Sequence, residues 1–82
     1  MKALVILVGL VAPMQTFHAS FTARNADKGY RDHFVIAFRG YNEVECASGI
    51  GPLMAVADWM AHHPDYVEPR DIHCAKPGEA DL

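Results

Sequence analysis

An uninterrupted apolar run near the N-terminus constrains this chain more than any other feature. After Met1 and Lys2, residues 3–11 read Ala-Leu-Val-Ile-Leu-Val-Gly-Leu-Val, and Pro13 follows closely. The run is too short to span a bilayer, which takes about 20 apolar residues, so no membrane span is expected. It fits either the hydrophobic region of a secretory signal or a strand buried on both faces.

Both interpretations of residues 1–13 have support. A lysine before an apolar stretch and a proline after it are typical of a signal segment. The best cleavage position then follows Ala19, although Phe17 stands where a small residue is expected. As a buried strand, the run would lie at the centre of a sheet, because at an edge it would invite aggregation. Translation starting at Met14 is a third possibility.

The meaning of the two cysteines depends on the same choice. In an exported protein, Cys46 and Cys74 are expected to form a disulfide, whereas in an intracellular protein they would be small core residues. Two cysteines are too few for a disulfide framework that could replace a hydrophobic core. The length of 82 residues predicts a single domain over residues 1–82.

The formal net charge of −3 hides an asymmetry between the two halves of the chain. Residues 1–41 carry five basic and two acidic side chains, whereas residues 42–82 carry two basic and eight acidic ones. An acidic half disfavours DNA or RNA as its direct ligand and favours a partner protein with a basic surface.

The region after the N-terminal run has the alternation of a β-hairpin. Residues 17–24 place apolar side chains at odd positions, which predicts a strand with one buried face. Residues 25–29 supply turn chemistry, and a second strand follows with Phe34, Ile36 and Phe38 on one face. The two segments are predicted to pair antiparallel.

One helix is predicted after the hairpin. Residues 46–52 are expected to be a flexible approach, Pro52 suits the first helical position, and Pro64 ends the helix near His62. The apolar positions at helical spacing predict one stripe that covers the sheet: Leu53, Val56, Ala57 and Met60.

A last strand is predicted over residues 66–74, followed by a flexible tail over residues 75–82. Pro69 cannot donate a hydrogen bond to a neighbour, so this strand should lie at an edge. The expected fold class is α+β: an antiparallel sheet of three to four strands covered on one face by a single helix, in β-β-β-α-β order.

No motif predicts catalysis or a cofactor. The histidines and cysteines lack the paired spacing of structural zinc sites. Cys46 as a nucleophile has no assignable orienting residue and lies several residues before the expected helix start. Gly49 and Gly51 lack the Lys and Ser/Thr of a phosphate-binding loop. We therefore expect no metal, no cofactor and no enzymatic activity.

Two kinds of function remain. The first is a small, acidic, monomeric binding protein in the host cytoplasm that occludes a basic surface of a partner protein. Its size, charge and expected architecture are similar to those of phage and mobile-element inhibitors such as anti-CRISPR proteins, a resemblance that covers no motif. The second is an exported protein, periplasmic or secreted, with a Cys46–Cys74 disulfide.

The candidate partner-binding residues combine acidic side chains near the ends of elements with aromatic anchors. Trp59 is expected to be either a residue at the rim of the core or an exposed anchor. The set is Glu43, Glu45, Trp59, Asp65, Tyr66, Glu68 and Asp71.

Overall fold

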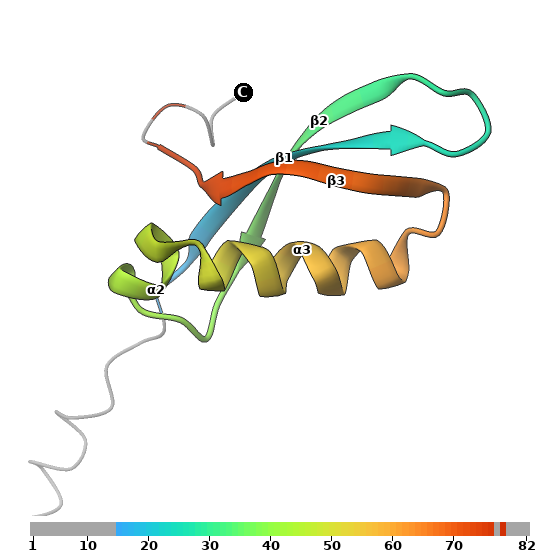
Figure 1. The fold of residues 1–82 in the computed structure, drawn as a ribbon. Helices are drawn as coiled ribbons and strands as arrows, with labels where there is room; N and C mark the ends of the chain where they lie inside the picture. The colour runs from blue at the N-terminus through green and yellow to red at the C-terminus, as the bar shows by residue number, and fades with distance from the viewer. Residues whose placement is uncertain (1–14, 77, 79–82) are drawn as a thin grey trace, which may run out of the picture.

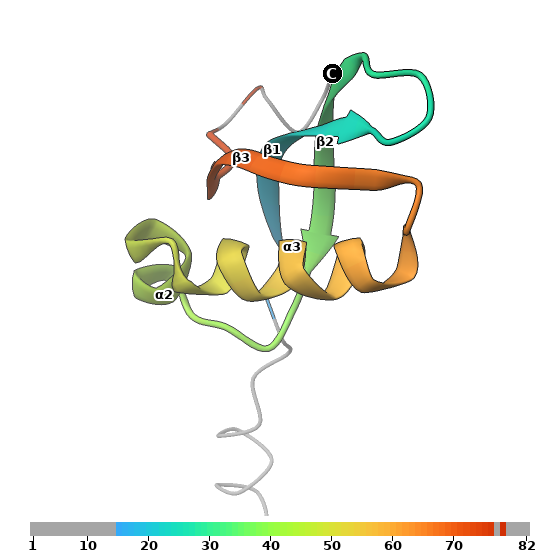
Figure 2. The same ribbon diagram turned by 45° about the vertical axis from the view of Figure 1, so that its right-hand side comes forward.

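The computed structural model describes residues 15–76 and 78. Its elements are β1 (Phe17–Asn25), β2 (Arg31–Phe38), α2 (Glu43–Ser48), α3 (Ile50–His62) and β3 (Tyr66–Cys74). The strands form an antiparallel sheet in the order β2-β1-β3, and both helices lie on one side of it (Figures 1 and 2). The α+β class is therefore confirmed, but the element order is β-β-α-α-β and the single helix predicted from the sequence is wrong.

Two predictions fall on residues outside this description. They are the N-terminal strand or signal segment, residues 1–13, and the tail at residues 77 and 79–82. The three described strands correspond to the remaining three predicted from the sequence.

The predicted hairpin of β1 and β2 is confirmed. Phe21 lies opposite Phe34 in the register, so the odd-numbered side chains of β1 share a face with the apolar residues of β2. In the turn, the Asn25 Oδ1 atom accepts hydrogen bonds from the backbone N–H groups of Asp27 and Lys28, at 3.1 and 2.8 Å. Gly29 adopts a φ of +80°, a conformation that glycine takes without steric cost.

The strand β3 pairs with β1 and lies at an edge of the sheet, as Pro69 predicted. The register of the β1–β3 pairing shifts twice, between Ser20 and Thr22 and between Thr22 and Arg24, as it does at β-bulges. Glu68 and Asp71, on either side of Pro69 and Arg70, both adopt a φ of 55°. The bulges let β3 absorb a proline while it continues along β1.

The predicted flexible approach at residues 46–52 is wrong, because most of it is helical. The helix α2 begins with a capping box, in which the Asn42 side chain accepts from the Glu45 N–H and the Glu45 carboxylate accepts from the Asn42 N–H, both at 2.8 Å. Gly49, with a φ of +93°, ends α2 and precedes α3. Pro52 is therefore the third residue of α3, while Pro64 does follow its end, as predicted.

The predicted phase of α3 is partly wrong. Val56 is fully buried and Met60 packs against the core, but Leu53 is 54% exposed and Ala57 is exposed. The inner face begins with Gly51, where an added Cβ would lie 3.0 Å from the Phe38 ring. Since Asp58 is the one charged residue of α3, the hydrophobic pattern could not distinguish the inner face from the outer one.

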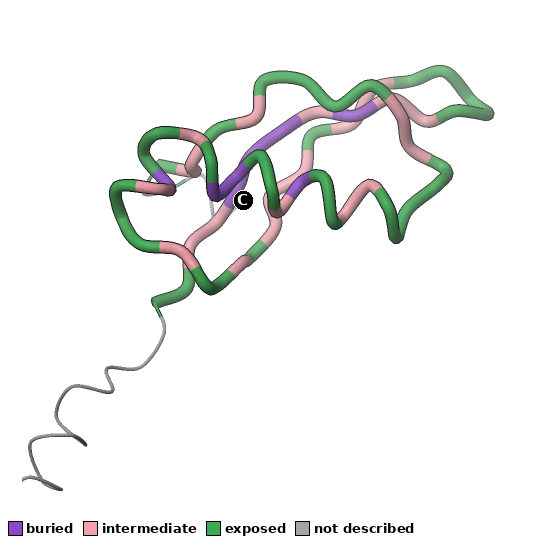
Figure 3. The backbone as a smooth tube through the Cα atoms, turned by 60° about the horizontal axis from the view of Figure 1, so that its bottom comes forward, coloured by how far each residue is buried: buried purple, intermediate pink, exposed green. Residues whose placement is uncertain are grey.

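The buried residues concentrate on β1 (Figure 3). The core cluster consists of Ala19, Phe21 and Ala23 of β1 with Val56 of α3. Partly buried side chains pack around it: Phe34, Ile36, Phe38, Trp59, Met60, Tyr66 and Ile72.

The corrected helix phase predicts unequal effects of truncation on stability. Val56→Ala should lower the free energy of unfolding by about 2 kcal/mol, because it removes buried methyl groups and leaves a cavity. Leu53→Ala should change it by less than about 0.5 kcal/mol, since the side chain is half exposed. Urea unfolding of both variants, measured at low protein concentration, checks this. A larger loss of unfolding free energy for Leu53→Ala than for Val56→Ala would show that the assigned phase of α3 is wrong.

Candidate functional site

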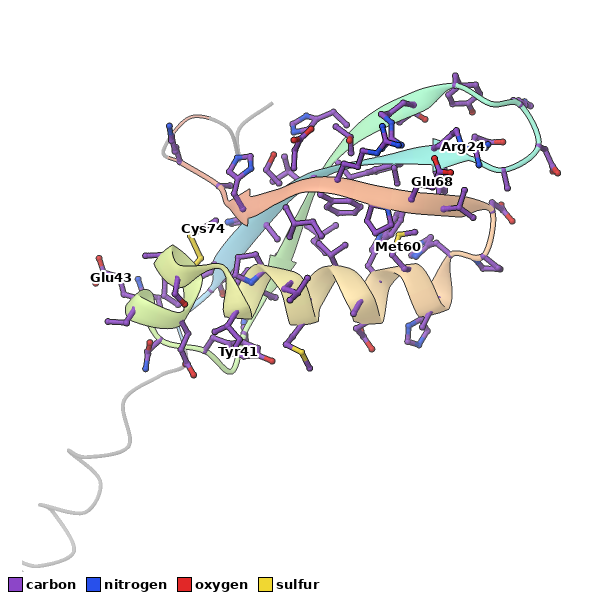
Figure 4. All side chains as sticks on the ribbon, viewed as in Figure 1. Arg24, Tyr41, Glu43, Met60, Glu68 and Cys74 are labelled. Atoms are coloured by element: carbon purple, nitrogen blue, oxygen red, sulfur yellow. A yellow bond between two sulfur atoms is a disulfide. The ribbon has the colours of Figure 1, made fainter. Side chains whose placement is uncertain are left out.

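A disulfide between Cys46 and Cys74 ties α2 to the end of β3 (Figure 4). The bond closes a sequence separation of 28 residues, and Cys46 is 1% exposed. The pairing is the one predicted for an exported protein. It removes both sulfur atoms as thiol nucleophiles, because a disulfide sulfur carries no thiolate.

The predicted partner-binding residues do not form one cluster. Glu43 lies on α2 at one end of the helical layer, whereas Glu68 lies well away from it on β3 (Figure 4). Glu45 is engaged in the capping box of α2, and Asp65 lies in the turn between α3 and β3. Glu43 and Glu45 lie in the first turn of α2, near the end of an element as predicted, whereas Glu68 and Asp71 lie inside β3.

Trp59 and Tyr66 extend the core. Their rings lie 4.7 and 5.0 Å from the ring of Phe34, measured between centroids, and both side chains are partly buried. The Tyr66 hydroxyl donates to a carboxylate oxygen of Asp32 at 3.2 Å. His63 stacks on Trp59 at a centroid distance of 3.9 Å. The structure therefore places Trp59 at the rim of the core, one of the two positions expected for it.

Glu68 lies at the centre of an arginine cluster. Its carboxylate is 3.0 Å from the Nε atom of Arg24, 3.5 Å from Arg31 and 3.9 Å from Arg70. The hydrogen bond and positive charge of Arg24 lower the pKa of Glu68. Arg31 also donates to the Glu68 carbonyl oxygen at 2.9 Å. A basic partner would have to compete with these arginines, so Glu68 is a poor contact residue.

The arginine cluster lies on the open face of the sheet. Thr22 lies opposite Arg70, and Arg24 lies opposite Arg31. The even-numbered side chains of β1 point away from the helices, because its odd-numbered ones fill the core. The positive charges of the sheet therefore gather on the face that the helices leave uncovered.

A Ser–His pair on the same face was not predicted from the sequence. The Ser20 hydroxyl lies 2.6 Å from the Nε2 atom of His33, across the β1–β2 pair. Ser20 is fully buried. A buried hydroxyl cannot reach a substrate, so the pair satisfies a polar group within the sheet.

Two hollows border α3. One of about 370 Å³ lies between α3 and β2 and includes Phe38, Trp59 and His62. The other, of about 380 Å³, lies between the start of α3 and β3 and includes Leu53 and Ile72. Both are open to the surface, and apolar side chains make up much of their walls.

The apolar surface of the helical layer was not predicted from the sequence. Several large apolar side chains are more than half exposed there: Val44, Ile50, Leu53 and Met54. Ala57 and Ala61 of α3 are also exposed. We call the five residues of α3 the outer stripe: Ile50, Leu53, Met54, Ala57 and Ala61. The signal for it was present, since a surface helix with one charge in 13 residues has too few polar residues for a solvated face.

Comparison with known proteins finds no matching family model, curated protein or solved structure. Within residues 15–76 and 78, no three His, Cys, Asp or Glu side chains are grouped as metal ligands. None of the described helices is long and apolar enough to cross a membrane. The function of the chain is therefore inferred from its own residues.

The disulfide should contribute a large share of the stability. Replacing both cysteines with alanine should lower the free energy of unfolding by roughly 3 kcal/mol, because the cross-link restricts the unfolded chain. Urea unfolding of the oxidised protein and of the double variant measures the difference. As a control, thiol labelling of the unfolded, unreduced protein should find no free cysteine. Equal stability of the two forms would contradict the prediction.

Proposed function

We propose that this chain is an exported small protein, periplasmic or secreted, that acts by binding a partner rather than by catalysis. The Cys46–Cys74 disulfide carries the proposal, since disulfides persist in oxidising compartments and are rare in the reducing cytosol. Lys2 and the apolar run at residues 3–11 supply a signal segment of suitable length.

The position of β1 changes where the signal is expected to be cut. Cleavage after Ala19 would remove the first three residues of β1, which pair with Phe38, Ala37 and Ile36. Ala19 is also fully buried in the core. A cut between residues 12 and 16 leaves β1 whole. The mature chain is therefore proposed to start upstream of Phe17.

Binding is favoured because the candidate nucleophiles are engaged in the structure. Cys46 is in the disulfide, and the Ser20 hydroxyl is buried against His33. The partner is proposed to be a protein with a basic surface, because residues 40–69 contain no Lys or Arg. Glu43, Asp65 and Asp71 are exposed, and they replace Glu68 as the acidic contacts of the proposal.

The cytoplasmic inhibitor expected from size and charge is the alternative. It would use the same acidic residues against a nucleic-acid-binding machine. It differs from the exported protein in retaining residues 1–13 and in having reduced cysteines, because the cytosol keeps thiols reduced.

Cell fractionation with intact-mass measurement of the native protein tests the proposed export. The expected product has lost 12 to 15 residues, lacks two hydrogen atoms because of the disulfide, and is found outside the cytoplasm. Loss of 19 residues would contradict the proposed cleavage region. A full-length cytoplasmic protein with two free thiols would overturn the export and favour the inhibitor.

The proposed partner class is tested by capture at two salt concentrations. Binding should weaken as salt rises, because the screening length falls from about 10 Å at 0.1 M to about 3 Å at 1 M. Asp65→Lys should weaken capture at low salt, since it reverses an exposed charge beside α3. Arg70→Glu, a charge reversal of opposite sign on the open face of the sheet, is the control and should not weaken capture. Capture that ignores salt and Asp65→Lys would contradict a basic partner.

A further inference from the structure

The helix α3 is apolar on two opposite sides. Its inner side packs on the sheet through Val56, Trp59 and Met60. Its outer stripe is exposed to solvent, with Leu53 and Met54 more than half exposed. Soluble monomers rarely expose a contiguous apolar surface of this kind, and such patches mark contact sites.

The geometry of the outer stripe fits another helix. Its residues follow the spacing i, i+3, i+4, i+7 and i+11, which places them in one row along the length of α3. Helices that pack lengthwise use this spacing, because side chains of one then fill the gaps between side chains of the other. The occupant of the stripe is therefore a helix that lies along α3.

The sizes of the side chains favour a second copy of α3 in the antiparallel direction. The first half of the stripe is bulky, with Ile50, Leu53 and Met54, whereas the second half has Ala57 and Ala61. A two-fold axis across the middle of the stripe places the bulky half of each copy against the small half of the other. Parallel packing would bring bulky residues together at one end and leave a gap at the other.

The two ends of the stripe also differ in charge. The helix α2 leads into the start of α3 and carries Glu43 and Glu45, whereas His62 and His63 stand at the far end. Antiparallel packing places the acidic end of each copy next to the histidine end of the other, whereas parallel packing would place the carboxylates of the two copies side by side, where like charges repel. Neither helix has a Lys or Arg that would favour a different arrangement.

We infer that two copies of this chain form a symmetric dimer through the outer stripes of antiparallel α3 helices, in place of the monomer expected from the sequence. The inference does not depend on the proposed export. The dimer leaves Asp65, Asp71 and the open face of the sheet outside the paired stripes, because they lie beyond α3, whereas Glu43 would then face the second copy and not the partner.

Sedimentation equilibrium of the native, oxidised chain over a range of concentrations is the first test. The wild-type protein should have the mass of a dimer. Leu53→Asp should raise the dimer dissociation constant at least about 100-fold, because each copy would bury an unpaired carboxylate. At low protein concentration, the free energy of unfolding of this variant should be nearly unchanged, since Leu53 is half exposed. Ala26→Asp, which adds the same charge in the exposed hairpin turn, is the control and should remain dimeric.

A charge-rescue experiment tests the antiparallel direction. Ile50→Lys and Ala61→Glu should each weaken the dimer alone, and an equimolar mixture should recover it, because the two positions face each other across the axis. A mixture of Ile50→Lys with Ile50→Glu should not recover it.

Three results would overturn the inference. A wild-type protein that stays monomeric would assign the outer stripe to a different protein. A dimer that persists in Leu53→Asp would place the contact elsewhere on the chain. Recovery by Ile50→Lys with Ile50→Glu would show parallel packing.

Discussion

The burial of one face of β1 beneath α3 is the contact on which the rest of the structure depends. Three β1 side chains, Ala19, Phe21 and Ala23, meet Val56 of α3 in the fully buried core. Because β1 is the central strand, β2 and β3 are positioned by their pairing with it. Gly51 allows the start of α3 to approach the ring of Phe38, so the helix can lie close to the sheet.

Because the core is so small, the disulfide is expected to contribute strongly to the stability of the fold. A chain of this length buries a limited share of its apolar surface, and small domains commonly add cross-links for that reason. The Cys46–Cys74 bond joins the short helix α2 to the end of the edge strand β3. Both elements lie at the periphery of the cluster around β1, so the covalent link holds the parts of the fold that core packing holds least.

The fold also separates charges that are mixed along the chain. The bulges of β3 bring Arg70 and Glu68 beside Arg24 and Arg31 on the open face of the sheet. The helical side has carboxylates but no Lys or Arg between residues 40 and 69. One acidic residue of the C-terminal half is thus paired by arginines, two of which come from the N-terminal half. The charge imbalance of the sequence therefore overstates the acidic surface available to a partner.

Local patterns in the sequence were sufficient for the hairpin, the edge position of β3 and the end of α3. Alternation with a period of two assigns each side chain of β1 to a face of the sheet. Pro69 and Pro64 each restrict hydrogen bonding and backbone conformation at their own position in the chain. The Asn42-x-x-Glu45 capping box of α2 was equally local but was not recognised. The phase of α3 was decided by tertiary structure, because Leu53 and Val56 are equally apolar and packing on β1 alone distinguishes them. The arginine cluster around Glu68 also needed the fold, since it joins residues of three strands whose register depends on bulges that no local pattern specifies.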